Sequence, residues 1–129
     1  MARKYRVGVI GHTGQGDYGH HLDEVWLKFP ECEIVSVADA DETGLAEAVK
    51  RLGGPKGFSD YRKMIEETKP DVVAICSRWI HEHRDMILAA AERGIHIYME
   101  KPFCRTPAEA DEIIDLCERT HSKLGIAFT

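Results

Sequence analysis

Glycines crowd one short segment of the sequence, directly after an apolar run. Residues 11–19 read GHTGQGDYG, and three of the glycines fit the spacing G-x-G-x-x-G. Positions without side chains let a backbone approach a pyrophosphate, and the free N–H groups of a following helix would face that anion. The segment therefore indicates a phosphate-binding turn. The candidate contacts within it are Gly11, Thr13, Gly14, Gly16 and Gly19.

A carboxylate lies at a suitable distance beyond this turn. Asp39 ends a second apolar run, EIVSVAD, about 20 residues after Gly19. A carboxylate in that place accepts hydrogen bonds from the adenosine ribose hydroxyls and repels a 2′-phosphate. We therefore expect NAD as the cofactor, with NADP less favoured. The alternative is that Asp39 only caps the turn before Asp41.

The elements that must position these residues alternate between strand and helix. Apolar runs predict strands at 5–11, 33–39, 71–76, 95–99 and 123–128. Apolar residues at helical spacing predict helices at 22–29, 45–52, 83–93 and 107–117, with a short strand or turn and a helix within 58–68. This alternation predicts one α/β domain, residues 1–129, with a Rossmann-type doubly wound parallel sheet and helices on both faces.

The segment GIHIYMEKPFCRTPAEADEI, residues 94–113, carries the most specific pattern in the sequence. It resembles the G-x-H-V-x-x-EKP-x-x-x-T signature of the glucose-fructose oxidoreductase, inositol dehydrogenase and rhizopine-catabolism (Gfo/Idh/MocA) family. The glycine turn, the VAD ending of the second strand and the run DVVAICSRWIHEH add to this resemblance. Together they cover nearly all of the chain and are similar to the N-terminal NAD(P)-binding domain of that family.

The resemblance implies roles for the residues at the ends of the third and fourth long strands. Lys101 would transfer a proton while hydride moves to the nicotinamide ring, so it is the candidate catalytic residue. Glu100 would orient Lys101 or contact the cofactor. His81 takes the place of the histidine in the T-P-N-x-x-H motif and would line the nicotinamide side of the cleft. Cys76 and Ser77, which replace the threonine and proline of that motif, are further candidate cofactor contacts.

The resemblance also implies a partner for this domain. Family members carry a second α/β domain that supplies a catalytic histidine, most of the pocket for a sugar or polyol substrate, and oligomer contacts. The sequence ends at Thr129, where that C-terminal domain would start, so we expect the domain to be absent here. The chain alone should then bind NAD(H) but turn over almost nothing, and a homo-oligomer is expected only of the full-length protein.

Composition excludes several classes of function. With 129 residues, a net charge of −5 and scattered basic residues, the chain lacks the footprint of a nucleic-acid-binding domain. No apolar stretch approaches the length of a membrane helix, and the N-terminal apolar run is too short for a signal peptide. The four cysteines form no C-x-x-C pair and the histidines no ligand spacing, so we expect reduced thiols, no metal and a cytoplasmic location.

Two other functions fit parts of the pattern. A non-catalytic NAD-binding sensor or regulatory subunit would share the glycine turn and Asp39 without needing Lys101. A methyltransferase also has a glycine turn and an acid at the end of the second strand. The Glu-Lys-Pro segment at residues 100–102 argues against the methyltransferase and favours the oxidoreductase.

Overall fold

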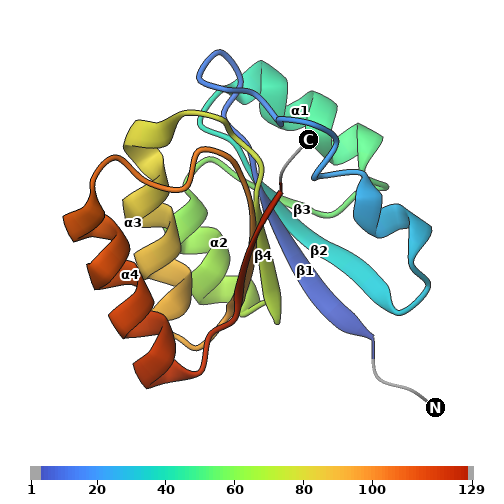
Figure 1. Ribbon diagram of the computed structural model, residues 1–129. Coiled ribbons are helices and arrows are strands. Elements are labelled where there is room, and N and C mark those ends of the chain that lie inside the picture. Colours follow the sequence, from blue (N-terminus) through green and yellow to red (C-terminus); the bar gives the residue numbers. More distant parts are fainter. Residues whose placement is uncertain (1–3, 128–129) are drawn as a thin grey trace.

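A computed structural model describes residues 4–127 of the chain and contains a six-stranded, wholly parallel sheet (Figure 1). The strand order is β3-β2-β1-β4-β5-β6, the order of a dinucleotide-binding doubly wound sheet. The strands are β1 (Tyr5–Ile10), β2 (Cys32–Ala38), β3 (Lys56–Phe58), β4 (Val72–Ile75), β5 (His96–Glu100) and β6 (Leu124–Ala127). The predicted fold class is therefore confirmed. Phe128, which the prediction gave to the last strand, lies outside the described residues.

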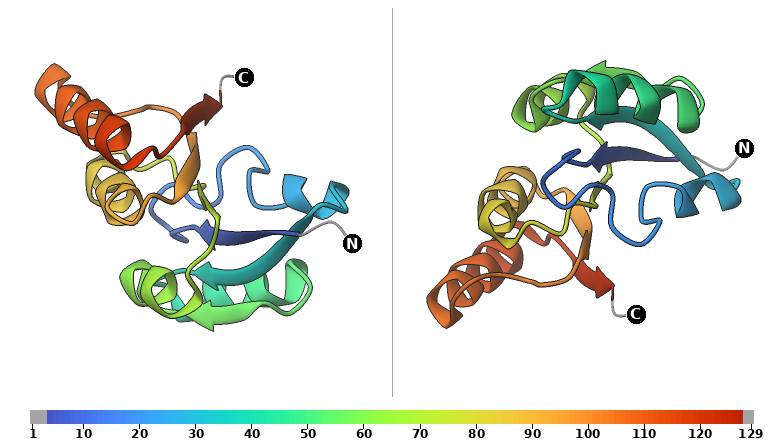
Figure 2. Two further views of the ribbon diagram at one scale, coloured as in Figure 1. Left: turned by 90° about the horizontal axis from the view of Figure 1, so that it is seen from below. Right: turned by 90° about the horizontal axis from the view of Figure 1, so that it is seen from above.

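Helices cover both faces of the sheet, as Figures 1 and 2 show. One face packs against α2 (Tyr61–Thr68), α3 (Ile80–Ala91) and α4 (Pro107–Thr120), and the other against α1 (Glu42–Arg51) and the short 3₁₀-helix η1 (Val25–Lys28). Each face has its own buried apolar cluster. Three of these helices, α1, α2 and α4, start at a capping residue. The side-chain oxygens of Asp41, Asp60 and Thr106 accept hydrogen bonds from first-turn N–H groups.

The helix predicted over 22–29 is wrong. Residues 12–24 form a series of turns, and only the four residues of η1 are helical. Asp17, Gly19 and His21 all have positive φ, so the chain is still in tight turns when it reaches Leu22, and η1 ends at Phe29, whose backbone is extended. The apolar residues that suggested a helical face are buried by other means: Leu22 packs into the sheet cluster directly, and Trp26 packs edge-on against Tyr98. A phosphate site at the start of a long helix is therefore not part of this fold.

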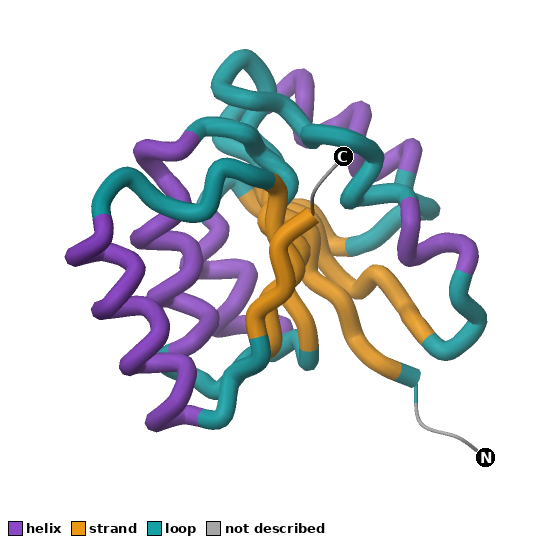
Figure 3. Tube along the Cα trace, in the orientation of Figure 1, coloured by secondary structure: helices purple, strands orange, loops and turns teal. Residues whose placement is uncertain are grey.

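The carboxyl ends of the parallel strands all meet at one edge of the sheet. Figure 3 shows the loops that leave these strand ends gathered at the top of the molecule. The connections after β1, β2, β4 and β5 therefore lie together, and β1 and β4 mark the point where the chain crosses from one half of the sheet to the other. Within residues 4–127, no helix is long and apolar enough to cross a membrane.

Candidate functional site

The segment that follows β1, residues 11–24, is called the glycine loop below. It starts beside β2, where the Gly11 N–H donates to the Ala38 carbonyl. It then crosses the strand ends toward β4, where the Gly16 carbonyl accepts a 3.2 Å hydrogen bond from the Arg78 N–H. Further on, the His20 N–H donates to Glu100 at the end of β5 over 2.9 Å. The glycine loop is thus tied to three strand ends at the edge where the sequence predicted a cofactor.

The glycines of this loop have different structural reasons to lack a side chain. Gly14 and Gly16 have φ of +86° and +89°, in the region that favours glycine. A Cβ on Gly14 would meet open space, whereas one on Gly16 would overlap the backbone nitrogens of Arg78 and Trp79. The close approach at Gly16 therefore adds a packing requirement to the conformational one.

This difference predicts unequal effects of alanine at the two positions. Gly14→Ala is expected to lower the free energy of unfolding by about 1 kcal/mol, because only the left-handed backbone is strained. Gly16→Ala is expected to cost about 2 kcal/mol, since the new methyl group also pushes against backbone. Urea unfolding followed by circular dichroism measures both values. Equal costs for the two variants would show that the loop does not pack on residues 78–79 in solution.

Asp39 lies at the end of β2 and is 1% exposed. Its Oδ2 accepts hydrogen bonds from the Thr13 hydroxyl over 2.6 Å and from the Tyr18 hydroxyl over 2.9 Å. Its Oδ1 accepts from the backbone N–H groups of Thr13 at 3.1 Å and Asp41 at 2.9 Å. Asp39 therefore both caps the turn before Asp41 and holds the glycine loop, and the structure brings it together with the predicted residue Thr13.

Tyr18 belongs to this site although its sequence position gave no sign of a role. Its ring lies against Gly11, so that a Cβ on Gly11 would overlap the ring. The Arg51 guanidinium lies over the ring, 4.9 Å from its centroid. Burial first, and then the charge of Asp39, raise the pKa of Tyr18 well above its usual value, so the phenol stays a hydrogen-bond donor. Only the three-dimensional contact with Asp39 identifies Tyr18.

Glu100 ends β5 and Lys101 follows it, but the two residues differ in environment. Glu100 is fully buried, and its carboxylate accepts from the backbone N–H of His20 and contacts the His20 ring Nδ1 at 3.0 Å. Lys101 is exposed on the turn that follows, and the Lys101–Pro102 peptide bond is cis. The structure therefore shows Glu100 as an anchor for the glycine loop and leaves Lys101 accessible at the same edge.

Cys76 and Ser77 follow β4 and are both buried. Burial is the main cause that raises the pKa of the Cys76 thiol, so the thiol is a weak nucleophile. The Ser77 hydroxyl has no hydrogen-bond partner among the described residues. A buried hydroxyl without a partner is uncommon in a folded protein and suits contact with a polar ligand. The Ser77 hydroxyl and the glycines at this edge are therefore compatible with a bound dinucleotide.

The two histidines at the start of α3 lie in different environments. His81 is exposed and lies against Trp79, with ring centroids 6.0 Å apart. His83 is fully buried, and its ring nitrogens contact the carbonyl oxygens of Pro102 at 2.5 Å and Ser77 at 2.7 Å. His83 therefore joins the segments that follow β4 and β5, and its contact in the second segment, Pro102, is the neighbour of Lys101 in the chain. Helical spacing was the missed signal, because His83 shares the buried face of α3 with Met86, Ile87 and Ala90.

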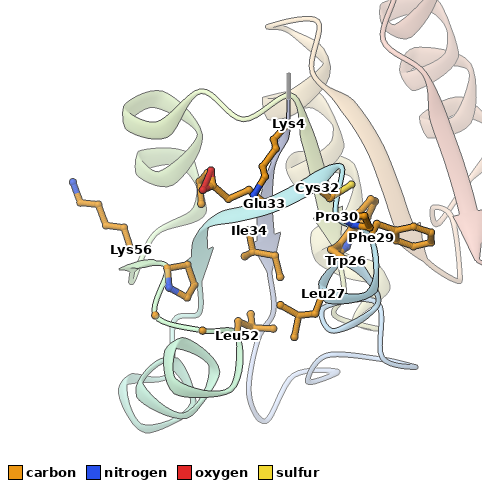
Figure 4. A pocket seen from close by; sticks show the side chains of 14 residues that line it. Lys4, Trp26, Leu27, Phe29, Pro30, Cys32, Glu33, Ile34, Leu52 and Lys56 are labelled. Carbon is orange, nitrogen blue, oxygen red and sulfur yellow. The ribbon is translucent and has the colours of Figure 1, made fainter. Parts of the chain in front are cut away.

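A broad open groove of about 790 Å³ lies elsewhere, at the amino ends of the first strands (Figure 4). Trp26, Phe29 and Ile34 give it an apolar lining, with Lys4 and Lys56 at its margin. Ligands of open parallel sheets bind outside the carboxyl ends of the strands. The groove is therefore separate from the candidate site. Beside Asp39 the structure holds a smaller cavity of about 30 Å³, which Gly11 and Tyr61 help to line.

The strand order, the glycine loop and the acid at the end of β2 define a dinucleotide-binding domain of the Rossmann class. The profile of the Gfo/Idh/MocA family, described as an oxidoreductase family with an NAD-binding Rossmann fold, matches residues 5–128. The chain belongs to this family, as the Glu-Lys-Pro segment predicted.

Individual relatives agree with this assignment. The chain is 29% identical over 110 residues to the myo-inositol 2-dehydrogenase of Thermotoga maritima, covering 85% of this chain and 32% of that protein. It is 30% identical over 125 residues to the D-glucoside 3-dehydrogenase of Escherichia coli, covering 95% and 34%. The crystal structure of a probable dehydrogenase from Thermotoga maritima superimposes with a TM-score of 0.83 at 27% identity, covering 95% and 35%. The chain thus spans about a third of the length of these relatives.

Proposed function

We propose that this chain is the cofactor-binding domain of an oxidoreductase that transfers hydride to NAD⁺ from a sugar or polyol carbon that bears a hydroxyl. One observation carries the proposal: Asp39, the glycine loop and Lys101 come from three strand ends and meet at the carboxyl edge of one parallel sheet. An exposed lysine beside a dinucleotide site is suited to moving the hydroxyl proton.

Each residue contributes a separate function in this proposal. The backbone of the glycine loop and the Ser77 hydroxyl hold the cofactor. The Asp39 carboxylate accepts hydrogen bonds from the ribose hydroxyls of the cofactor. The nicotinamide supplies the hydride acceptor when it is bound. Lys101 Nζ takes the proton from the substrate oxygen as the hydride leaves, so that the hydroxyl carbon becomes a carbonyl. His81 and Cys76, also predicted to contact the cofactor, remain predictions.

The choice of cofactor, the substrate class, the further domain and the cellular location are each supported by a different observation. The charge of Asp39 favours NAD over NADP, because the carboxylate repels a 2′-phosphate. The names of the relatives, which include an inositol dehydrogenase and a glucoside dehydrogenase, support a sugar or polyol substrate. Their greater length supports a further domain that completes the substrate pocket and carries oligomer contacts. Four free thiols among the described residues agree with the cytoplasmic location that we propose.

Titration of the chain with NAD⁺ and NADP⁺ tests the cofactor assignment. The unmodified chain is expected to bind NAD⁺ more tightly than NADP⁺. Asp39→Asn is expected to weaken NAD⁺ binding about thirtyfold, since hydrogen bonds to a charged acceptor contribute roughly 2 kcal/mol. The preference for NAD⁺ should shrink as well, because the repelling charge is gone. Isothermal titration calorimetry measures the dissociation constants.

Asp41→Asn is the matched control for this substitution. Asp41 lies two residues further on, and its carboxylate caps α1 through the Gly44 N–H at 2.8 Å. Asparagine is also a good N-cap, so this variant should keep its stability and its affinity for NAD⁺. Absence of saturation with NAD⁺ up to millimolar concentrations would contradict the proposed function, as would equal effects of the two substitutions.

A further inference from the structure

The carboxylate that would hold the cofactor ribose is already bound to hydroxyl groups of the protein. Thr13 Oγ1 and Tyr18 Oη both donate to Asp39 Oδ2, over 2.6 and 2.9 Å. A ribose diol would present the same chemistry to Asp39, namely two hydroxyl donors. The protein's own hydroxyls and those of the cofactor therefore need the same acceptor.

The space around Asp39 leaves no room for both sets of hydroxyls. Asp39 is 1% exposed, and the cavity beside it measures about 30 Å³. That volume suits one or two water molecules and is far too small for a ribose. The Tyr18 ring also covers Gly11, the first residue of the phosphate-binding turn. The glycine loop in this conformation thus closes the ribose position.

Other contacts hold the loop in this closed position from both sides. Arg51 on α1 lies over the Tyr18 ring and donates to Asp23 in the loop through Nη2 at 2.8 Å. On the opposite side, His12 Nδ1 lies 2.6 Å from Glu82 Oε1 on α3. The loop is therefore fixed as a unit by contacts with both helical layers, and the Tyr18 ring is held where its hydroxyl reaches Asp39.

We infer that the glycine loop is an autoinhibitory closure, in which Thr13 and Tyr18 compete with the cofactor ribose for Asp39. This inference rests on the proposed function, because it assigns the ribose to Asp39. Binding then requires the loop to release Asp39 first. A protein whose binding-competent form is a minor fraction shows an affinity reduced by that fraction. The Thr13 and Tyr18 hydroxyls therefore lower the affinity for the cofactor in the closed form, and any contact of Thr13 with the cofactor requires the loop to open first.

Removing one competing hydroxyl should make the cofactor bind more tightly. Tyr18→Phe keeps the ring over Gly11 and deletes only the donor to Asp39. We expect its dissociation constant for NAD⁺ to fall about fivefold, with faster association, because the closed form loses a charge-assisted hydrogen bond. Thr13→Val deletes the other hydroxyl at similar volume and should act in the same direction. Calorimetry on the 129-residue chain gives the constants, and stopped-flow fluorescence gives the association rates.

Tyr5→Phe is the matched control, since Tyr5 is 55% exposed at the opposite end of β1. It should leave both the constant and the rate unchanged. A second readout follows the Tyr18 hydroxyl proton by nuclear magnetic resonance. The proton should exchange slowly with water in the free chain and lose that protection when NAD⁺ saturates the protein.

The outcomes separate this inference from the proposed function. If the unmodified chain binds NAD⁺ but Tyr18→Phe and Thr13→Val bind it equally or more weakly, the closure is wrong and the proposed function stands. Retention of the protected hydroxyl proton at NAD⁺ saturation would also overturn the closure. If neither the unmodified chain nor the two variants bind NAD⁺, both ideas fail together.

Discussion

Replacing Lys101 with alanine is expected to slow NAD-linked oxidation of a sugar or polyol about a thousandfold, because positioned proton transfer contributes on the order of 10²–10⁴ in rate. The dissociation constant for NAD⁺ should stay within about threefold, since Lys101 lies on the exposed turn after β5 and holds no part of the glycine loop. A loss in kcat with binding preserved is the signature of a group used mainly in the transition state. The initial rate of NADH formation under saturating NAD⁺ measures the effect.

Lys101→Arg distinguishes proton transfer from a simple need for positive charge. Arginine keeps the charge but stays protonated, so it should not restore the rate. Lys63→Ala removes an exposed lysine from α2 and should have no effect. The chain alone is expected to turn over almost nothing, and the relatives are about three times as long, so the rates are compared in a longer protein that contains this chain. In a longer protein that contains this chain, unchanged turnover in Lys101→Ala would rule out its catalytic role, and NAD⁺ binding without any turnover would favour the sensor function.

The sheet was predictable because its signals are local. Each apolar run of the sequence became a strand within one or two residues, and α1, α2, α3 and α4 begin near their expected positions. Caps such as Thr106 followed by Pro107 act over three residues, so their geometry follows from the sequence alone. The short strand β3 was only partly foreseen, because three residues carry little periodicity.

The structure of the region after β1 was the main feature that the sequence did not predict. The reason is that tertiary contacts, and not local sequence, determine its conformation. Leu22, Trp26 and Phe29 have helical spacing, but the eight residues from Leu22 to Phe29 are few for an isolated helix. Long-range contacts hold the glycine loop in turns instead, among them the bond from the His20 N–H to Glu100. Partners 80 residues apart leave no pattern in a single sequence.

The residues of the candidate site also fall into two groups: those that a local sequence pattern indicates and those that only three-dimensional contacts reveal. Spacing was enough to select Asp39, because distance from a glycine turn is a local measure. Family resemblance selected Lys101 through a contiguous signature. Tyr18 and His83 escaped because their importance depends on what they touch: a carboxylate across the edge in one case, and two carbonyl oxygens in the other. Buried polar side chains with several partners are therefore the class of site residue that pattern reading misses here.

His83→Ala is expected to lower the free energy of unfolding by about 4 kcal/mol, which combines the loss of a buried ring with the loss of its hydrogen bonding to the carbonyls of Ser77 and Pro102. His83 is fully buried and contacts the carbonyl oxygens of Ser77 and Pro102. Its removal leaves both oxygens without this partner and opens a cavity between α3 and the ends of β4 and β5. Urea unfolding monitored by circular dichroism measures the loss.

His81→Ala is the matched control, because it lies on the same helix two residues earlier but is exposed. Both substitutions gain the same small amount of helix propensity, roughly 0.5 kcal/mol, so the difference between them reports burial and hydrogen bonding alone. His83→Phe refines the result: it fills the space without donating a hydrogen bond, and should recover about half of the loss. Similar stabilities for His83→Ala and His81→Ala would mean that His83 does not join the two strand ends. In that case the position of the turn that carries Lys101 must depend on other contacts, such as that between His20 and the buried carboxylate of Glu100.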